Sequence, residues 1–124
     1  MAFEEGLTFN QRTIIAAADL SAKQYFAINA GNLATAAKAI DGILQDNPLL
    51  GKAGAIATRG ITRAVITASQ TLTAGVTQLE VATGGTLSVL AAGIAVAMAR
   101  ESLTSVAATR IVAVELLPSN AAHA

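Results

Sequence analysis

The stretch GILQDNPLLGKAGAIATRGITRAVIT, residues Gly42 to Thr67, decides the fold of this 124-residue chain. It holds three short apolar runs, and the last two, Ala53–Thr58 and Ile61–Thr67, are rich in β-branched residues that favour extended backbone. Asp46-Asn47-Pro48 predicts a turn after the first run, because proline disfavours a helical residue before it. We expect a break at Arg59-Gly60, where glycine lets the backbone bend. The stretch therefore predicts a β meander at the centre of the protein.

The N-terminal side of this stretch predicts further short strands, at Thr13–Ala17 and Tyr25–Asn29. Residues 33–44 are ambiguous. Their apolar positions share one helical face, yet Gly42 and the turn that follows suit a strand. We favour a loop followed by a strand at Ala39–Gln45, and a helix stays open as the alternative.

The C-terminal side also reads as strands and turns. Thr73-Ala74-Gly75 predicts a turn, and Gly84-Gly85 predicts a hairpin, because both glycines accept positive φ. The paired strands are expected at Val76–Ala82, with Leu79 and Val81 on one face, and at Thr86–Leu90, with Leu87 and Val89 inward. Large residues then alternate with alanine at Ile94, Val96 and Met98, the pattern of a small barrel or sandwich interior. Arg100–Ala108 predicts a loop, and Arg110–Leu117 a central last strand.

About eight short strands with turn chemistry between them predict an all-β fold, a small β-barrel or sandwich. We expect an extended N-terminal arm at residues 1–12, a single β domain at 13–118 and a C-terminal tail at 119–124. The arm carries Phe3, Leu7, Phe9 and Arg12. Its aromatic residues either fold back on their own core or dock on a partner and become ordered there.

Composition restricts the partners of the protein. Charged residues make up 13% of the chain, about half the usual share, so we expect neighbouring protein to cover part of the surface. The eight basic residues are scattered singly, which disfavours binding to nucleic acid. No membrane association is expected, because the most apolar window, Leu87–Ala99, is shorter than the roughly 20 residues that span a bilayer. The acidic start of the chain does not resemble a signal peptide, and cysteine is absent.

Reactive groups are few, and we expect no enzyme. His123, the sole histidine, lies one residue from the end, which is a poor place for a catalytic base. The carboxylates of Asp41, Asp46, Glu80 and Glu115 are dispersed, so they suit neither acid–base catalysis nor a metal site. Gly84-Gly85 lacks the Gly-Lys-Ser/Thr sequence of a phosphate loop. The sequence thus predicts no catalytic residues, no metal and no cofactor.

Several strings resemble, in order and spacing, a family of small bacteriophage head proteins, the capsid decoration or cement proteins, which are sometimes mislabelled as recombinases. The strings are AAADLSAKQY at 16–25, GILQDNP at 42–48, GITRAV at 60–65, Thr73-Ala74-Gly75, Gly93-Ile94-Ala95 and VELLP at 114–118. They extend over most of residues 13–118, although the alanine-rich region 76–92 departs from the family pattern.

The resemblance implies a small β-rich virion protein on the outer surface of the phage capsid, made in the host cytoplasm. Its expected partners are the major capsid protein and further copies of itself, as a homotrimer. We expect the arm residues Phe3, Leu7, Phe9 and Arg12 to make the capsid or subunit contacts. The alternatives are an adhesion or receptor-binding module of a phage fibre or tail, and a small enzyme.

Overall fold

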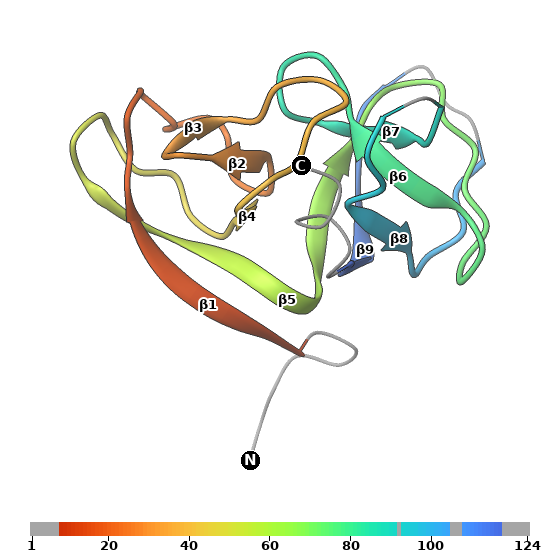
Figure 1. Cartoon of the computed structure of the whole chain (residues 1–124). Coiled ribbons are helices and arrows are strands. Elements are labelled where there is room, and N and C mark those ends of the chain that lie inside the picture. Colours follow the sequence, from red (N-terminus) through yellow and green to blue (C-terminus); the bar gives the residue numbers. More distant parts are fainter. Residues whose placement is uncertain (1–7, 92, 105–107, 118–124) are drawn as a thin grey trace.

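The computed structural model describes residues 8–91, 93–104 and 108–117, and in these ranges the protein consists of nine strands without a helix. The all-β prediction is therefore confirmed, and no described segment forms an apolar helix that could cross a membrane. The strands are β1 (Thr8–Ile15), β2 (Ala27–Asn29), β3 (Asn32–Leu33), β4 (Gly42–Leu44), β5 (Ala53–Ile66), β6 (Gln78–Val81), β7 (Leu87–Val89), β8 (Ala97–Ala99) and β9 (Arg110–Leu116) (Figure 1).

Strand β5 has 14 residues and bends near its middle, so that it belongs to two groups of strands (Figure 1). At the bend, Gly60 has a φ of +94°, and the pairing with β1 shifts register so that Thr58 is an extra residue on β5. Glycine accepts positive φ, and an extra residue bends a strand and increases its twist. The predicted meander is wrong, because the runs on either side of Arg59-Gly60 continue one another instead of pairing.

The first half of β5 lies in an open sheet with the order β3-β2-β4-β5, and β1 pairs antiparallel with β5 on its other side. One face of this sheet covers a small core made of Ala16, Leu20, Ile28, Leu44 and Ile56. Ala16 and Leu20 come from the loop between β1 and β2, and their packing against the sheet protects its apolar face from water.

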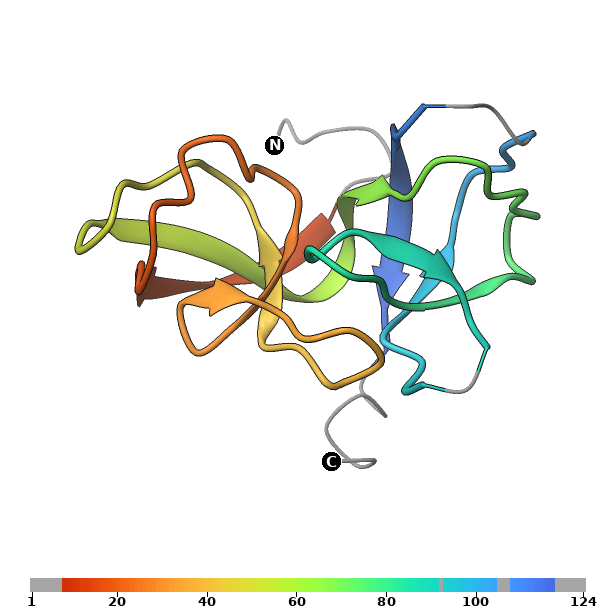
Figure 2. The same cartoon turned by 90° about the horizontal axis from the view of Figure 1, so that it is seen from above.

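The second half of β5 forms a closed five-stranded barrel with β7, β6, β8 and β9, in that order. The ring closes where β9 pairs with β5, from Leu116 opposite Gly60 to Arg110 opposite Ile66. Closure leaves no free strand edge in this half. The barrel and the open sheet lie side by side, with β5 running through both (Figure 2). Large interior residues of the barrel alternate with alanines: Leu79, Val81, Leu87 and Val114 with Ala64, Ala97 and Ala99.

Two predicted turns, the central last strand and the interpretation of residues 33–44 are confirmed in outline. Val76 N–H donates to Thr73 O at 3.1 Å in the 73–75 turn, and Gly84 and Gly85 have φ values of +89° and +91° in the β6–β7 hairpin. Strand β9 is central, since it pairs with both β5 and β8. Residues 34–41 form a loop without a helix, as favoured, and the strand that follows, β4, is shorter than the predicted Ala39–Gln45. Leu33 belongs to β3.

Several predicted boundaries and orientations are wrong. The first strand begins at Thr8, not Thr13, and ends at Ile15, because the N–H groups of Ala16 and Ala17 turn to Lys52 O and Gly31 O. Residues 8–12, expected in the arm, thus pair with β5. Val89 is 39% exposed at the end of β7. In β8 the alanines are buried and Met98 is half-buried, because the opposing Leu79, Val114 and Leu116 already fill the interior.

The buried Thr62 links the two halves of the fold, and we expect the Thr62→Val variant to lose about 1 kcal/mol of unfolding free energy. Gln45, which follows β4, donates from Nε2 to Thr62 Oγ1 at 2.9 Å and to Ile43 O at 3.0 Å. Valine keeps the shape and leaves one Gln45 N–H without its acceptor. Urea unfolding measures the change. Thr13→Val, at an exposed position, is the matched control and should change the free energy by less than about 0.5 kcal/mol; equal values for both variants would contradict this role of Thr62.

Candidate functional site

The predicted contact residues fall on or before β1. Phe3 and Leu7 lie outside the described residues. Phe9 lies in β1, where its backbone faces Gly60. Arg12 is exposed on the same strand, with its guanidinium 3.5 Å from the Asp41 carboxylate. Such an exposed ion pair contributes little to stability. The assignment of these four residues to a capsid or subunit contact stays a prediction.

The end of β1 and the loop before β5 lie side by side at the end of the open sheet farthest from the barrel (Figures 1 and 2), and both carry exposed large apolar residues. These are Ile15 at the end of β1 and Leu49 and Leu50 in the loop before β5, which are 61%, 56% and 63% exposed. We call these three residues the apolar tip. Sequence reasoning missed them, although two adjacent leucines between Pro48 and Gly51 are an unusual composition for a turn.

Backbone hydrogen bonds hold the apolar tip in shape. Lys52 N–H donates to Leu49 O at 3.0 Å, which closes a turn around the two leucines. Gly51 N–H donates to Ala16 O and Ala16 N–H to Lys52 O, both at 2.9 Å, so this turn is fastened to the end of β1. The leucines are thus displayed on an ordered turn, and little conformational entropy would be lost when a partner covers them.

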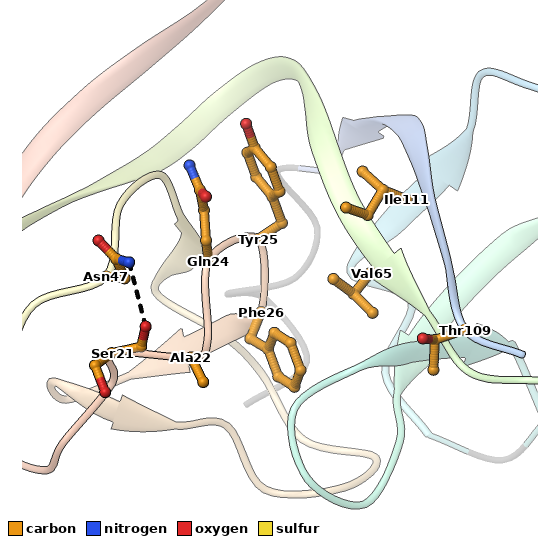
Figure 3. A pocket seen from close by; sticks show the side chains of 9 residues that line it. All are labelled: Ser21, Ala22, Gln24, Tyr25, Phe26, Asn47, Val65, Thr109 and Ile111. Atoms are coloured by element: carbon orange, nitrogen blue, oxygen red, sulfur yellow. Dashed lines mark hydrogen bonds between the residues drawn. The ribbon is translucent and has the colours of Figure 1, made fainter.

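A second feature is a hollow of about 480 Å³ between the open sheet and the barrel (Figure 3). Part of its wall comes from the 21–26 loop and the turn at Asn47, and the rest from β5 and the start of β9. Asn47 Nδ2 donates to Ser21 O at 3.2 Å and joins the two loop segments. The lining residues are Ser21, Ala22, Gln24, Tyr25, Phe26, Asn47, Val65, Thr109 and Ile111.

Tyr25 is held in the left-handed region, with a φ of +72°. Its N–H donates to Leu44 O at 2.7 Å, and its C=O accepts from Val65 N at 3.1 Å, so β4 and β5 together fix its backbone. A residue with a bulky side chain rarely adopts this conformation, because its Cβ crowds the backbone. Tyr25 also packs against the barrel core. In Figure 3 its ring stands beside Gln24, with Val65 and Ile111 across from it.

A chain of amide hydrogen bonds connects the hollow to the fold. Gln24 Nε2 donates to Gln45 O at 3.0 Å, and Gln45 Nε2 in turn donates to Thr62 Oγ1. Phe26, the neighbour of Tyr25, carries the Lys23 ammonium over its ring at 5.0 Å from the ring centre. Tyr25-Phe26 is the one pair of adjacent aromatic residues in the sequence, and it was the signal that could have pointed to this site.

Asp19 helps to shape the start of the 21–26 loop. Ser21 N–H donates to Asp19 Oδ1 at 3.0 Å. Hydrogen bonds from the Ser21 side chain and backbone lower the pKa of Asp19 below its ordinary value. Because the folded pKa is the lower one, these bonds stabilise the fold above the unfolded pKa and lose their effect as the pH falls through the folded pKa.

The four carboxylates considered as acid–base candidates lie in different places and have separate partners. Asp41 accepts from Ala30 N–H at 2.8 Å, and Asp46 from Ala55 N–H at 3.3 Å. Glu80 accepts from Gly93 N–H at 2.8 Å, and Glu115 lies 3.5 Å from Arg100. Within residues 8–91, 93–104 and 108–117, no three histidine or acidic side chains gather in a way that could hold a metal ion. His123 lies outside the described residues.

The fold has a counterpart among solved structures. The N base of the head fibre gp8.5 of bacteriophage phi29 superposes with a TM-score of 0.59 and 14% sequence identity, over 89% of this chain and 95% of that chain. No protein-family model and no curated protein matches the sequence. At this identity the likeness establishes a shared fold: the chain is similar in architecture to the base of a phage head fibre.

Proposed function

We propose that this protein is a structural component of a phage particle, a decoration protein that binds the outer surface of the assembled capsid lattice and stabilises it. The observation that carries the proposal is the fold shared, over nearly the whole length of both chains, with a phage head fibre base. The sequence strings that resemble capsid decoration proteins point the same way. The role is mechanical, and the proposal assigns the protein no reaction, metal or cofactor.

The apolar tip supplies a surface suited to such a contact. Three exposed aliphatic side chains, two of them on an ordered turn, release water when a partner covers them, and each fully buried Leu or Ile contributes about 1.5–3 kcal/mol. A contact of this size is weak alone, but a lattice repeats it many times. A protein that binds only the assembled lattice shifts the equilibrium towards assembly. A homotrimer, the expected oligomer, would strengthen attachment further, and sedimentation of the free protein measures that state.

Purified protein mixed with phage heads that lack it provides the direct test. We expect co-sedimentation to saturate at a fixed ratio to the major capsid protein, and the loaded heads to resist heating better than bare heads. Binding to host cells without binding to heads would favour the alternative, an adhesion or receptor-binding module of a fibre or tail, and would refute the capsid assignment.

The double variant Leu49→Ser/Leu50→Ser is expected to bind heads at least about tenfold more weakly, because it removes the apolar surface that the lattice would cover. Both positions are exposed, so the thermal unfolding midpoint should change little. Titration of heads with labelled protein measures the effect. Val76→Ser is the matched control, since Val76 is 70% exposed but lies in the turn before β6. Unchanged affinity of the double variant would exclude the apolar tip as the capsid contact.

A further inference from the structure

The hydrogen-bonding side chains that line the hollow are uncharged. Ser21, Gln24, Asn47 and Thr109 carry neutral hydroxyl and amide groups, which can donate and accept, and Tyr25 adds a phenol. One N–H of the Gln24 amide and one of the Asn47 amide already donate within the protein, to Gln45 O and Ser21 O. No acidic or basic residue is among the lining residues. Lys23 lies beside the lining, with its ammonium 5.0 Å from the centre of the Phe26 ring. The hollow therefore suits a neutral ligand rich in groups that donate and accept.

Apolar surface accompanies these polar groups. Val65 and Ile111 face the ring of Tyr25 across the hollow (Figure 3), and Ile111 is 54% exposed. The volume of about 480 Å³ lies within the roughly 300–1,000 Å³ typical of ligand sites. An aromatic ring beside aliphatic residues offers a flat apolar surface, and the hydroxyl and amide groups around it fix the orientation of what lies on that surface.

The backbone conformation of Tyr25 indicates that the hollow is a binding site and not a chance gap between two groups of strands. The fold keeps a tyrosine at a φ of +72°, where glycine or asparagine would be less strained, and fixes its backbone through both Leu44 and Val65. Strained residues that the surrounding structure holds in place concentrate at binding sites. The bond from Gln24 Nε2 to Gln45 O likewise limits the freedom of the Gln24 side chain, so the Tyr25 backbone and the Gln24 amide are both held in place before a ligand binds.

We propose that the hollow binds a neutral saccharide. A sugar offers hydroxyl groups that donate and accept, which matches the Ser, Thr, Asn and Gln side chains, and a face of C–H groups, which matches the tyrosine ring. A phosphorylated or acidic ligand would need cationic partners that the lining lacks. The inference goes beyond capsid attachment and does not depend on it, because none of the three residues of the apolar tip lines the hollow. The same protein would then attach to the shell and hold a glycan.

Amide NMR titration of the full chain tests this assignment, with maltotriose, cellotriose and chitotriose as probes and adenosine as a neutral non-sugar probe. We expect at least one trisaccharide to shift the signals of Gln24, Tyr25 and Thr109 while those of Leu49 and Leu50 stay in place. The Gln24→Ala variant should weaken that binding by about tenfold through loss of the amide, and it should lower the unfolding midpoint only slightly, because the lost bond to Gln45 O is exposed.

Gln78→Ala is the matched control, because Gln78 is an exposed glutamine on β6 outside the lining, and it should keep full affinity. Tyr25→Phe tests the hydroxyl without removing the ring. The assignment is overturned if no trisaccharide shifts the signals of the hollow, if adenosine shifts them as strongly as the sugars, or if Gln24→Ala and Gln78→Ala bind alike. Gln24→Ala and Gln78→Ala should both bind phage heads as the unchanged protein does. A failure of the saccharide proposal can therefore be told apart from a failure of the capsid proposal.

Discussion

The Gly31→Ala variant is expected to lose at least about 3 kcal/mol of unfolding free energy, a large fraction of the stability of a domain this size. Gly31 lies in the turn between β2 and β3 with a φ of +79°, and a Cβ added there would stand 2.5 Å from Ile15 O and 3.2 Å from Ala17 N. Both atoms belong to backbone, so no side chain can rotate away. The end of β1 would have to move.

That movement would break contacts that organise the open sheet. Gly31 O accepts from Ala17 N–H at 2.8 Å, which fastens the segment after β1 to the β2–β3 turn. The neighbouring Ala16 belongs to the small core with Leu20 and Ile56. A shift of this segment would therefore loosen both the sheet and its cover.

Gly31→Ala is expected to lose unfolding free energy for two reasons, the positive φ and the close approach of the added Cβ to backbone atoms. The Gly51→Ala variant separates the two. Gly51 has nearly the same φ, +81°, but nothing lies within 4 Å of an added Cβ. Its alanine variant should lose only the cost of positive φ, about 1–2 kcal/mol. Guanidinium unfolding of both variants measures the difference. Similar losses would show that the close approach to Ile15 O is relieved at little cost and that conformational strain alone matters.

Local chemistry in the sequence was enough to predict the fold class and several turns. β-branched residues, Gly84-Gly85 and the 73–75 turn each act over a few neighbouring residues, and each behaves as expected. The apolar residues of Arg110–Leu117 likewise predicted a central strand, and β9 is central because it pairs with both β5 and β8. Only the face of Val112, Val114 and Leu116 is buried, however, and Ile111 on the other face is 54% exposed.

Features that depend on distant residues could not be predicted in this way. Gly60 signals a change of direction, but whether it breaks or bends a strand depends on β1 and β9, which pair around it. The parallel contact between Ile66 and Leu87 has no local signature at all. The hollow brings the 21–26 loop together with Thr109 and Ile111, more than eighty residues away in the sequence. The apolar tip depends on the path of the loop before β5.

The Leu79→Ala variant is expected to cost about 3–5 kcal/mol, the upper part of the usual range for a buried leucine. Leu79 lies on β6 between β7 and β8 and has no exposed surface. Ala97, directly opposite on β8, and Ala64 and Ala99 in the same core are too short to fill the space that the leucine side chain leaves. A core rich in alanine has few large side chains, so each contributes a larger share of the burial energy.

Val89 provides the matched control for the barrel interior, because it is the partner of Leu79 on β7 but is 39% exposed at the end of that strand. Val89→Ala should cost less than about 1 kcal/mol, since its methyl groups already contact water. Urea unfolding of both variants measures the two losses of unfolding free energy. The comparison requires that the free energy falls with urea concentration at the same slope in both variants. A wide gap is expected only if β5, β7, β6, β8 and β9 close into a barrel around Leu79. Losses of equal size would mean that Leu79 has no enclosed interior around it, and the closed ring would have to be abandoned in favour of an open sheet.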